Sequence, residues 1–86
     1  MVTVYDVKNL ELFFNTINQF DNPVTIQTEK GEYSEDLRNN AMLQQVIASV
    51  VGEKGLEQIC LSIEGKEDID KIVTFLLYKN KQGRYS

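Results

Sequence analysis

The spacing of hydrophobic residues switches repeatedly along this 86-residue chain between a period of two and a period of three to four. A period of two places alternate side chains on opposite faces of a strand, whereas the longer period gathers them on one stripe of a helix. Three short segments alternate apolar with polar residues, which predicts strands over residues 2–5, 24–28 and 57–63. Residues 29–32 resemble a tight turn, which predicts a hairpin with a short return strand at Tyr33.

Three further segments carry apolar residues three or four positions apart, which predicts amphipathic helices. The first covers about residues 8–19, with Asp6 as its N-cap. The second runs from capping residues at 34–36 to Gly52, which stands where a C-cap glycine belongs. The third begins near Glu67 and ends near Lys79. The core-facing stripe of the second helix is expected to contain Leu43, Val46, Ile47, Val50 and Val51.

The order of these segments predicts an α/β fold, with an α+β arrangement as the alternative. It is a small two-layer sandwich, β-α-β(-β)-α-β-α, with three or four strands and three helices. The strand-helix-strand connections favour some parallel pairing. We expect a single domain over residues 1–80 and a flexible C-terminal tail over residues 81–86.

The chain lacks the residues on which most catalysis near neutral pH depends. It has no histidine, one cysteine (Cys60) and no glycine-rich phosphate loop. The sequence therefore predicts a protein that is not an enzyme and holds no metal or cofactor. A lone cysteine forms no internal disulfide, which fits a reducing cytoplasm. No apolar run approaches the roughly 18 residues of a membrane span, so no membrane association is expected.

Acidic residues suggest one candidate binding surface. All 13 acidic residues lie within residues 1–70, whereas residues 71–86 carry four basic residues and no acidic one. This distribution disfavours nucleic-acid binding. Carboxylates compete with phosphate for Lys and Arg, so an acidic surface at Glu32, Glu35 and Asp36 is a candidate partner-binding site. The alternative is that these acids, like a second cluster over residues 64–70, are solvated helix caps.

Apolar residues outside the helical stripes suggest a second candidate surface. Leu12 and Phe20 fall off the stripe of the first helix, and Phe75 and Tyr78 flank that of the third. A helix that is apolar over a wide arc is buried on more than one side. We therefore expect a homodimer or a protein partner to cover these residues, unless the two helices cover each other.

Together these patterns predict a small acidic cytoplasmic protein-interaction module, an adaptor or accessory protein without catalytic activity. The alternative is an inhibitor of the phage or mobile-element type. Such an inhibitor would bind a basic, nucleic-acid-handling protein through its acidic surface, and this binding would weaken with salt.

Overall fold

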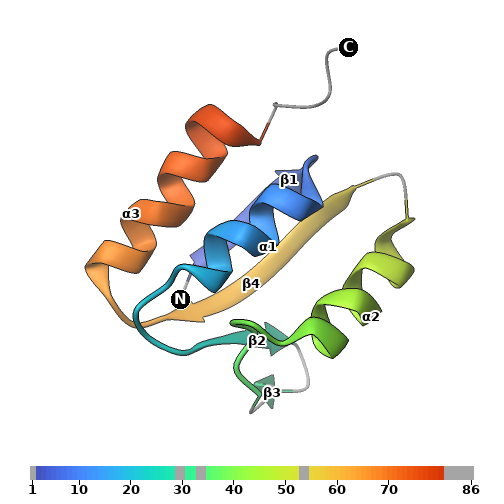
Figure 1. Ribbon diagram of the computed structural model, residues 1–86, viewed down its shortest axis with the longest axis horizontal. Helices are drawn as coiled ribbons and strands as arrows, with labels where there is room; N and C mark the ends of the chain where they lie inside the picture. Colours follow the sequence, from blue (N-terminus) through green and yellow to red (C-terminus); the bar gives the residue numbers. More distant parts are fainter. Residues whose placement is uncertain (1, 29–30, 33–34, 53–54, 81–86) are drawn as a thin grey trace.

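The computed structural model describes residues 2–28, 31–32, 35–52 and 55–80. These residues form four strands and three helices (Figure 1). The strands are β1 (Val2–Val7), β2 (Val24–Thr28), β3 (Gly31–Glu32) and β4 (Leu56–Ile63). The helices are α1 (Leu10–Asn18), α2 (Ala41–Val51) and α3 (Lys66–Thr74), which continues as a π-helical turn over Phe75–Lys79. The predicted tail and the return-strand residue Tyr33 lie outside the described residues.

The described strands form one sheet in the order β1-β4-β2-β3, and every neighbouring pair is antiparallel. The predicted order of elements and the two-layer α+β architecture are confirmed, but the predicted parallel pairing is wrong. β1 and β2 run in the same direction, as a strand-helix-strand connection requires. They are not neighbours, because β4 lies between them and runs opposite to both. The β2–β3 pairing confirms the hairpin, but Gly31 and Glu32, which were predicted to belong to the turn, form its return strand.

All three helices lie on one side of the sheet, with α1 between α2 and α3 (Figure 1). On the covered face the strands contribute buried residues at alternate positions, namely Val4, Val24, Ile26, Ile59, Leu61 and Ile63. The positions between them carry mostly polar residues that are half-buried or exposed, including Thr3, Tyr5, Gln58, Cys60 and Ser62. The molecule therefore has a single hydrophobic core between the sheet and the helices.

The centre of that core is formed where α1 packs beside α3 and the π-helical turn. The ring of Phe13 lies 5.6 Å from the ring of Phe14 and 5.6 Å from that of Phe75, measured between centroids. Ile17 and Ile72 are fully buried in the same core. The wide apolar arcs of the first and third predicted helices therefore cover each other.

This packing corrects the predicted surface patch. Phe20 and Phe75 are buried in the core, and Leu12 is partly buried against it. Tyr78 is exposed, so it is the one member of that group on the surface of the described residues. The expectation that these residues stand together on the surface is wrong, because α1 and α3 lie side by side and bury them.

The end of β1 is held by the side chain of Asn80, just past the π-helical turn. Its Nδ2 donates to the carbonyl oxygen of Asp6 at 2.7 Å, and its Oδ1 accepts from the N–H of Lys8 at 2.8 Å. Asp6 belongs to β1, so the prediction that it caps the first helix is wrong. The cap is Asn9, because the strand continues to Val7 and delays the helix start to Leu10.

Two carboxylates hold the segment that leads into β2. Both oxygens of Asp68 are used: Oδ1 accepts from the N–H of Asp21 at 2.8 Å, and Oδ2 accepts from that of Asn22 at 2.9 Å. Oδ1 of Asp36 accepts from the N–H of Val24 at 3.1 Å. Pro23, between these residues, has no N–H. The backbone N–H groups over residues 21–24 are thus all bound by carboxylates.

The role expected for Asp68 therefore needs correction. Asp68 lies in the first turn of α3, as predicted, but its side chain is buried rather than solvated. Burial raises the pKa of a carboxyl group. The N–H donors of Asp21 and Asn22 and the nearby ammonium of Lys71 outweigh that effect and hold the pKa of Asp68 below its ordinary value.

We expect the substitution Asp68→Asn to lower the free energy of unfolding by about 2–3 kcal/mol, because an amide replaces one acceptor oxygen with a donor that faces an N–H group. Urea denaturation measures this change. The matched control is Asp70→Asn on the exposed side of the same helix, which should change stability by no more than about 0.5 kcal/mol. Equal effects of the two substitutions would contradict the assigned role of Asp68.

Stability should also fall in acid. Burial acts to raise the pKa of Asp36, but its bonds to Arg38 and Val24 outweigh this, so its pKa, like that of Asp68, lies below the ordinary value. The unfolded chain then binds protons more readily than the folded chain. Stability is fully present above the ordinary carboxyl pKa and is lost as the pH falls through the lowered values. Urea titrations from pH 6 down to about pH 2 should show this loss, and Asp68→Asn should reduce it.

Candidate functional site

α2 is the helix that the rest of the molecule covers least. All eleven of its residues are among those described, and none of them is buried. Its sequence, AMLQQVIASVV, contains no charged residue, although 26% of the whole chain is charged. An uncharged, mostly apolar helix with none of its residues buried is unusual on a protein surface.

The outer face of α2 carries an exposed apolar ridge. Met42, Val46 and Val50 are spaced four residues apart and are 78%, 54% and 81% exposed. A second row beside it contains Ala41, Gln45 and Ser49, which are exposed and uncharged. Val46 and Val50 were predicted to belong to the core-facing stripe. They border the side of α2 that faces the sheet, but both are more than half exposed, so the prediction that they are buried in the core is wrong.

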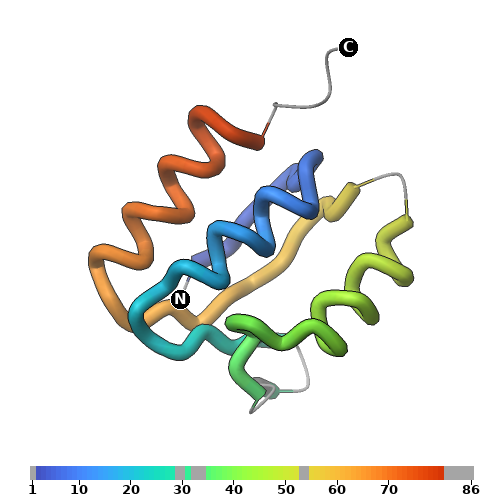
Figure 2. The backbone as a smooth tube through the Cα atoms, in the orientation of Figure 1, coloured from blue at the N-terminus to red at the C-terminus, as the bar shows by residue number. Residues whose placement is uncertain are grey.

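An apolar cleft of about 260 Å³ lies between α2 and the sheet. The described residues that line it all have apolar side chains: Leu43, Val46, Ile47, Val50 and Val51 from α2, and Ile26, Leu56 and Ile59 from the sheet. Figure 2 shows the reason, since α1 lies closer to α3 than to α2 and leaves this side of the sheet to α2 alone. We define the ridge Met42, Val46 and Val50 together with this cleft as the α2 surface.

The first turn of α2 is fixed by polar contacts. Oδ1 of Asn40 accepts from the N–H of Leu43 at 3.1 Å and caps the helix. The side chain of Gln44 donates to Oδ1 of Asn18 at 2.7 Å and to the carbonyl oxygen of Leu37 at 3.0 Å. The predicted cap at residues 34–36 is therefore wrong, because Asp36 is used at β2 and the helix begins at Ala41. In the second half of α2, Ile47 packs against the hydrophobic core.

The predicted acidic surface is reduced by this arrangement. Oδ2 of Asp36 accepts from Nε of Arg38 at 2.9 Å and pairs with the second guanidinium nitrogen at 2.8 Å, while Oδ1 binds backbone N–H groups. Both oxygens of Asp36 are thus used within the fold. Glu35 is exposed. Glu32 pairs with Gln27 in the hairpin, and its side chain lies outside what the structure describes.

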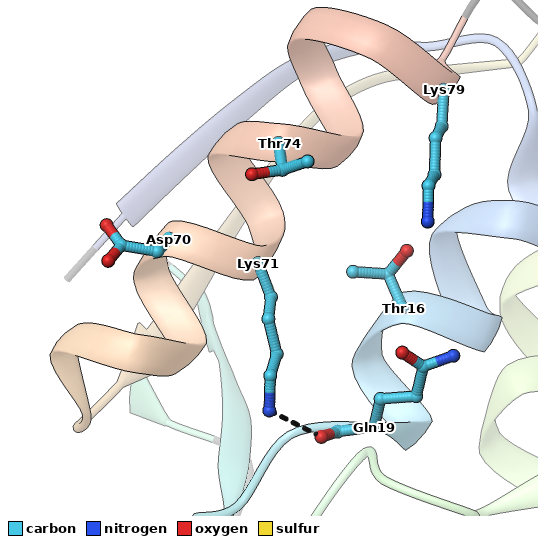
Figure 3. A pocket seen from close by; sticks show the side chains of 6 residues that line it. All are labelled: Thr16, Gln19, Asp70, Lys71, Thr74 and Lys79. Atoms are coloured by element: carbon cyan, nitrogen blue, oxygen red, sulfur yellow. Dashed lines mark hydrogen bonds between the residues drawn. The ribbon is translucent and has the colours of Figure 1, made fainter.

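A second, polar pocket of about 200 Å³ lies between α1 and α3, lined by Thr16, Gln19, Asp70, Lys71, Thr74 and Lys79. Figure 3 shows Lys71 reaching across it to the carbonyl oxygen of Gln19, a hydrogen bond of 2.8 Å. The same ammonium lies 3.6 Å from carboxylate oxygens of Asp21 and Asp68. Lys71 therefore neutralises the C-terminal end of α1 and the nearby carboxylates, and it is not held ready for a ligand.

Cys60, the lone cysteine, is half-buried on the polar face of the sheet, where it accepts a weak hydrogen bond from Oγ1 of Thr3 at 3.6 Å. Among the described residues, no three Cys, Asp or Glu side chains are grouped closely enough to hold a metal ion. Within the same residues, no helix has the length and apolar character needed to cross a membrane.

Comparisons with known proteins found no match. No protein-family model matches the chain. No similar protein was found among curated proteins or among solved structures.

We expect the backbone amides of α2 to exchange with solvent deuterium faster than those of β4 in dilute solution. β4 pairs with a strand on each side and contributes three buried residues, whereas α2 contributes none. Segments with few buried contacts open locally at a low free-energy cost. Hydrogen exchange followed by mass spectrometry measures the difference, and equal protection of α2 and β4 would contradict the loose packing of α2.

Proposed function

We propose that this protein is a non-catalytic protein-interaction module that binds an apolar protein surface through the α2 surface. The observation that carries the proposal is the exposure of Met42, Val46 and Val50 on a helix without any charge. Moving one such side chain fully out of water is favourable by about 1.5–3 kcal/mol. A protein partner that covers the ridge would gain part of that free energy at each position.

The cleft behind the ridge supports the same proposal. Apolar pockets bordered by a helix are common anchor sites for aromatic or aliphatic side chains of a partner. Among the described residues that line this cleft, none has a charged or hydrogen-bonding side chain with which to orient a polar substrate. We extend the proposal to an adaptor or accessory role in the cytoplasm, as expected from the lone Cys60.

The test uses the tagged protein as bait in lysate of its native host. We expect Val46→Glu to lose the proteins that the wild type retains, because the partner would have to bury a carboxylate in an apolar contact. The matched control is Leu77→Glu, which makes a similar change at a 66% exposed residue of the π-helical turn. This control should retain the same proteins as the wild type.

Both variants should keep the circular dichroism of the wild type, since each replaces an exposed side chain. Quantitative mass spectrometry of the retained proteins gives the comparison. If Val46→Glu retains every protein that the wild type retains, the α2 surface is not the binding site.

A further inference from the structure

The charge pattern of the molecule limits what can cover the α2 surface. The chain has a net charge of −4 at pH 7, and its acidic residues are spread over most of its length. A basic partner would gain electrostatic attraction from the acidic residues elsewhere on the molecule, but none from the uncharged helix α2. A second copy of the chain is repelled by those acidic residues and approaches most favourably where there is no charge. α2 is an eleven-residue surface of that kind.

The exposed polar residues of α2 are also suited to meet their own copies. In a two-fold symmetric contact, a residue near the axis faces itself, so a carboxylate or an ammonium there would face a like charge. Gln45 and Ser49 are exposed, and each has both a donor and an acceptor. Gln45, which is next to the central residue of α2, can therefore form a hydrogen bond with its own copy.

The apolar ridge has the symmetry that such a contact requires. Val46 is the central residue of α2, and Met42 and Val50 lie four residues to either side. When two such helices pack antiparallel about an axis at Val46, Val46 meets its own copy and Met42 meets Val50 of the other copy. Ridges spaced four residues apart are the ones that interdigitate in the commonest class of helix packing.

We infer that the α2 surface joins two copies of this chain into a two-fold symmetric dimer, through antiparallel packing of α2 against α2 centred on Val46. This inference rests on the proposed function and names the partner. Val46 and Val50 also line the cleft, so the second copy extends the apolar contact from the ridge to the mouth of the cleft.

Sedimentation equilibrium of the full chain tests the oligomeric state. We expect a species of twice the 9.9 kDa chain mass whose fraction rises with concentration. Val46→Glu should weaken association by about 100-fold or more, because it places two carboxylates face to face in an apolar contact. Leu77→Glu should dimerise like the wild type.

Cysteine cross-linking tests the register, in a Cys60→Ser background that removes the native thiol. Under mild oxidation, Val46→Cys should form a disulfide-linked dimer, since two residues at the axis come within disulfide distance. A mixture of Met42→Cys and Val50→Cys chains should cross-link to each other more than either does alone. Leu77→Cys, a control of similar exposure, should remain uncross-linked.

The outcomes separate the dimer from the proposed function. A wild-type chain that stays monomeric at every concentration overturns the dimer. The proposed function still stands in that case if Val46→Glu loses proteins that the wild type and Leu77→Glu retain. A dimer that Val46→Glu leaves intact, or cross-linking as efficient at residue 77 as at residue 46, overturns the α2 contact.

Discussion

The carboxylate of Asp68 connects the three parts of the molecule that have to be held in place for the core to form. It lies in the first turn of α3 and accepts the backbone N–H groups of Asp21 and Asn22, which join α1 to β2. Gly65, just before α3, leaves room for the side chain of Asn22, since a Cβ there would lie 2.6 Å from Nδ2 of that side chain. A buried carboxylate is stable only because those donors and Lys71 compensate for its lost hydration.

Once that junction is fixed, the division of the sheet between the helices follows. α3 is drawn against α1, and Phe13, Ile72 and Phe75 fill the space between them. These two helices leave the β2 side of the covered face to α2 (Figure 1). A chain of 86 residues buries only about 60–65% of the surface that its unfolded form exposes. In this molecule α2 is the helix that remains least buried, and its apolar ridge is exposed.

The same division explains which predictions from the sequence failed. The element types were predicted along most of the described chain, because the periodicity of β4 and of α1 is local and strong. Helix starts were displaced at Leu10 and Ala41, where Asn9 and Asn40 are the caps. Asp6 and Asp36 looked like caps, but the strand extends through one and the other binds β2. Where two nearby polar residues could each cap a helix, the sequence does not show which of them caps it and which binds a strand far away in the chain.

The candidate site was missed for a related reason, although one signal was present. Residues 41–51 contain no charged residue, whereas α1 and α3 each contain at least one. This is the feature of the sequence that distinguishes α2 from the other two helices. Phe20 and Phe75 instead predicted an exposed patch, because they are large and lie off a regular helical stripe. Hydrophobic pattern predicts that a face will be covered, but it does not say whether the covering residues belong to the same chain.

The sequence by itself determined the type and order of most elements, the two-layer class and the lack of histidine chemistry, because these depend on local periodicity and on composition. The tertiary structure alone decided that β4 enters between β1 and β2, and that Asp68 is buried. It also decided that α2, which carries no charged residue, has none of its residues buried and keeps an exposed apolar ridge. Each of these outcomes depends on contacts between segments far apart in the sequence, such as the 46 and 47 residues that separate Asp68 from its two N–H donors.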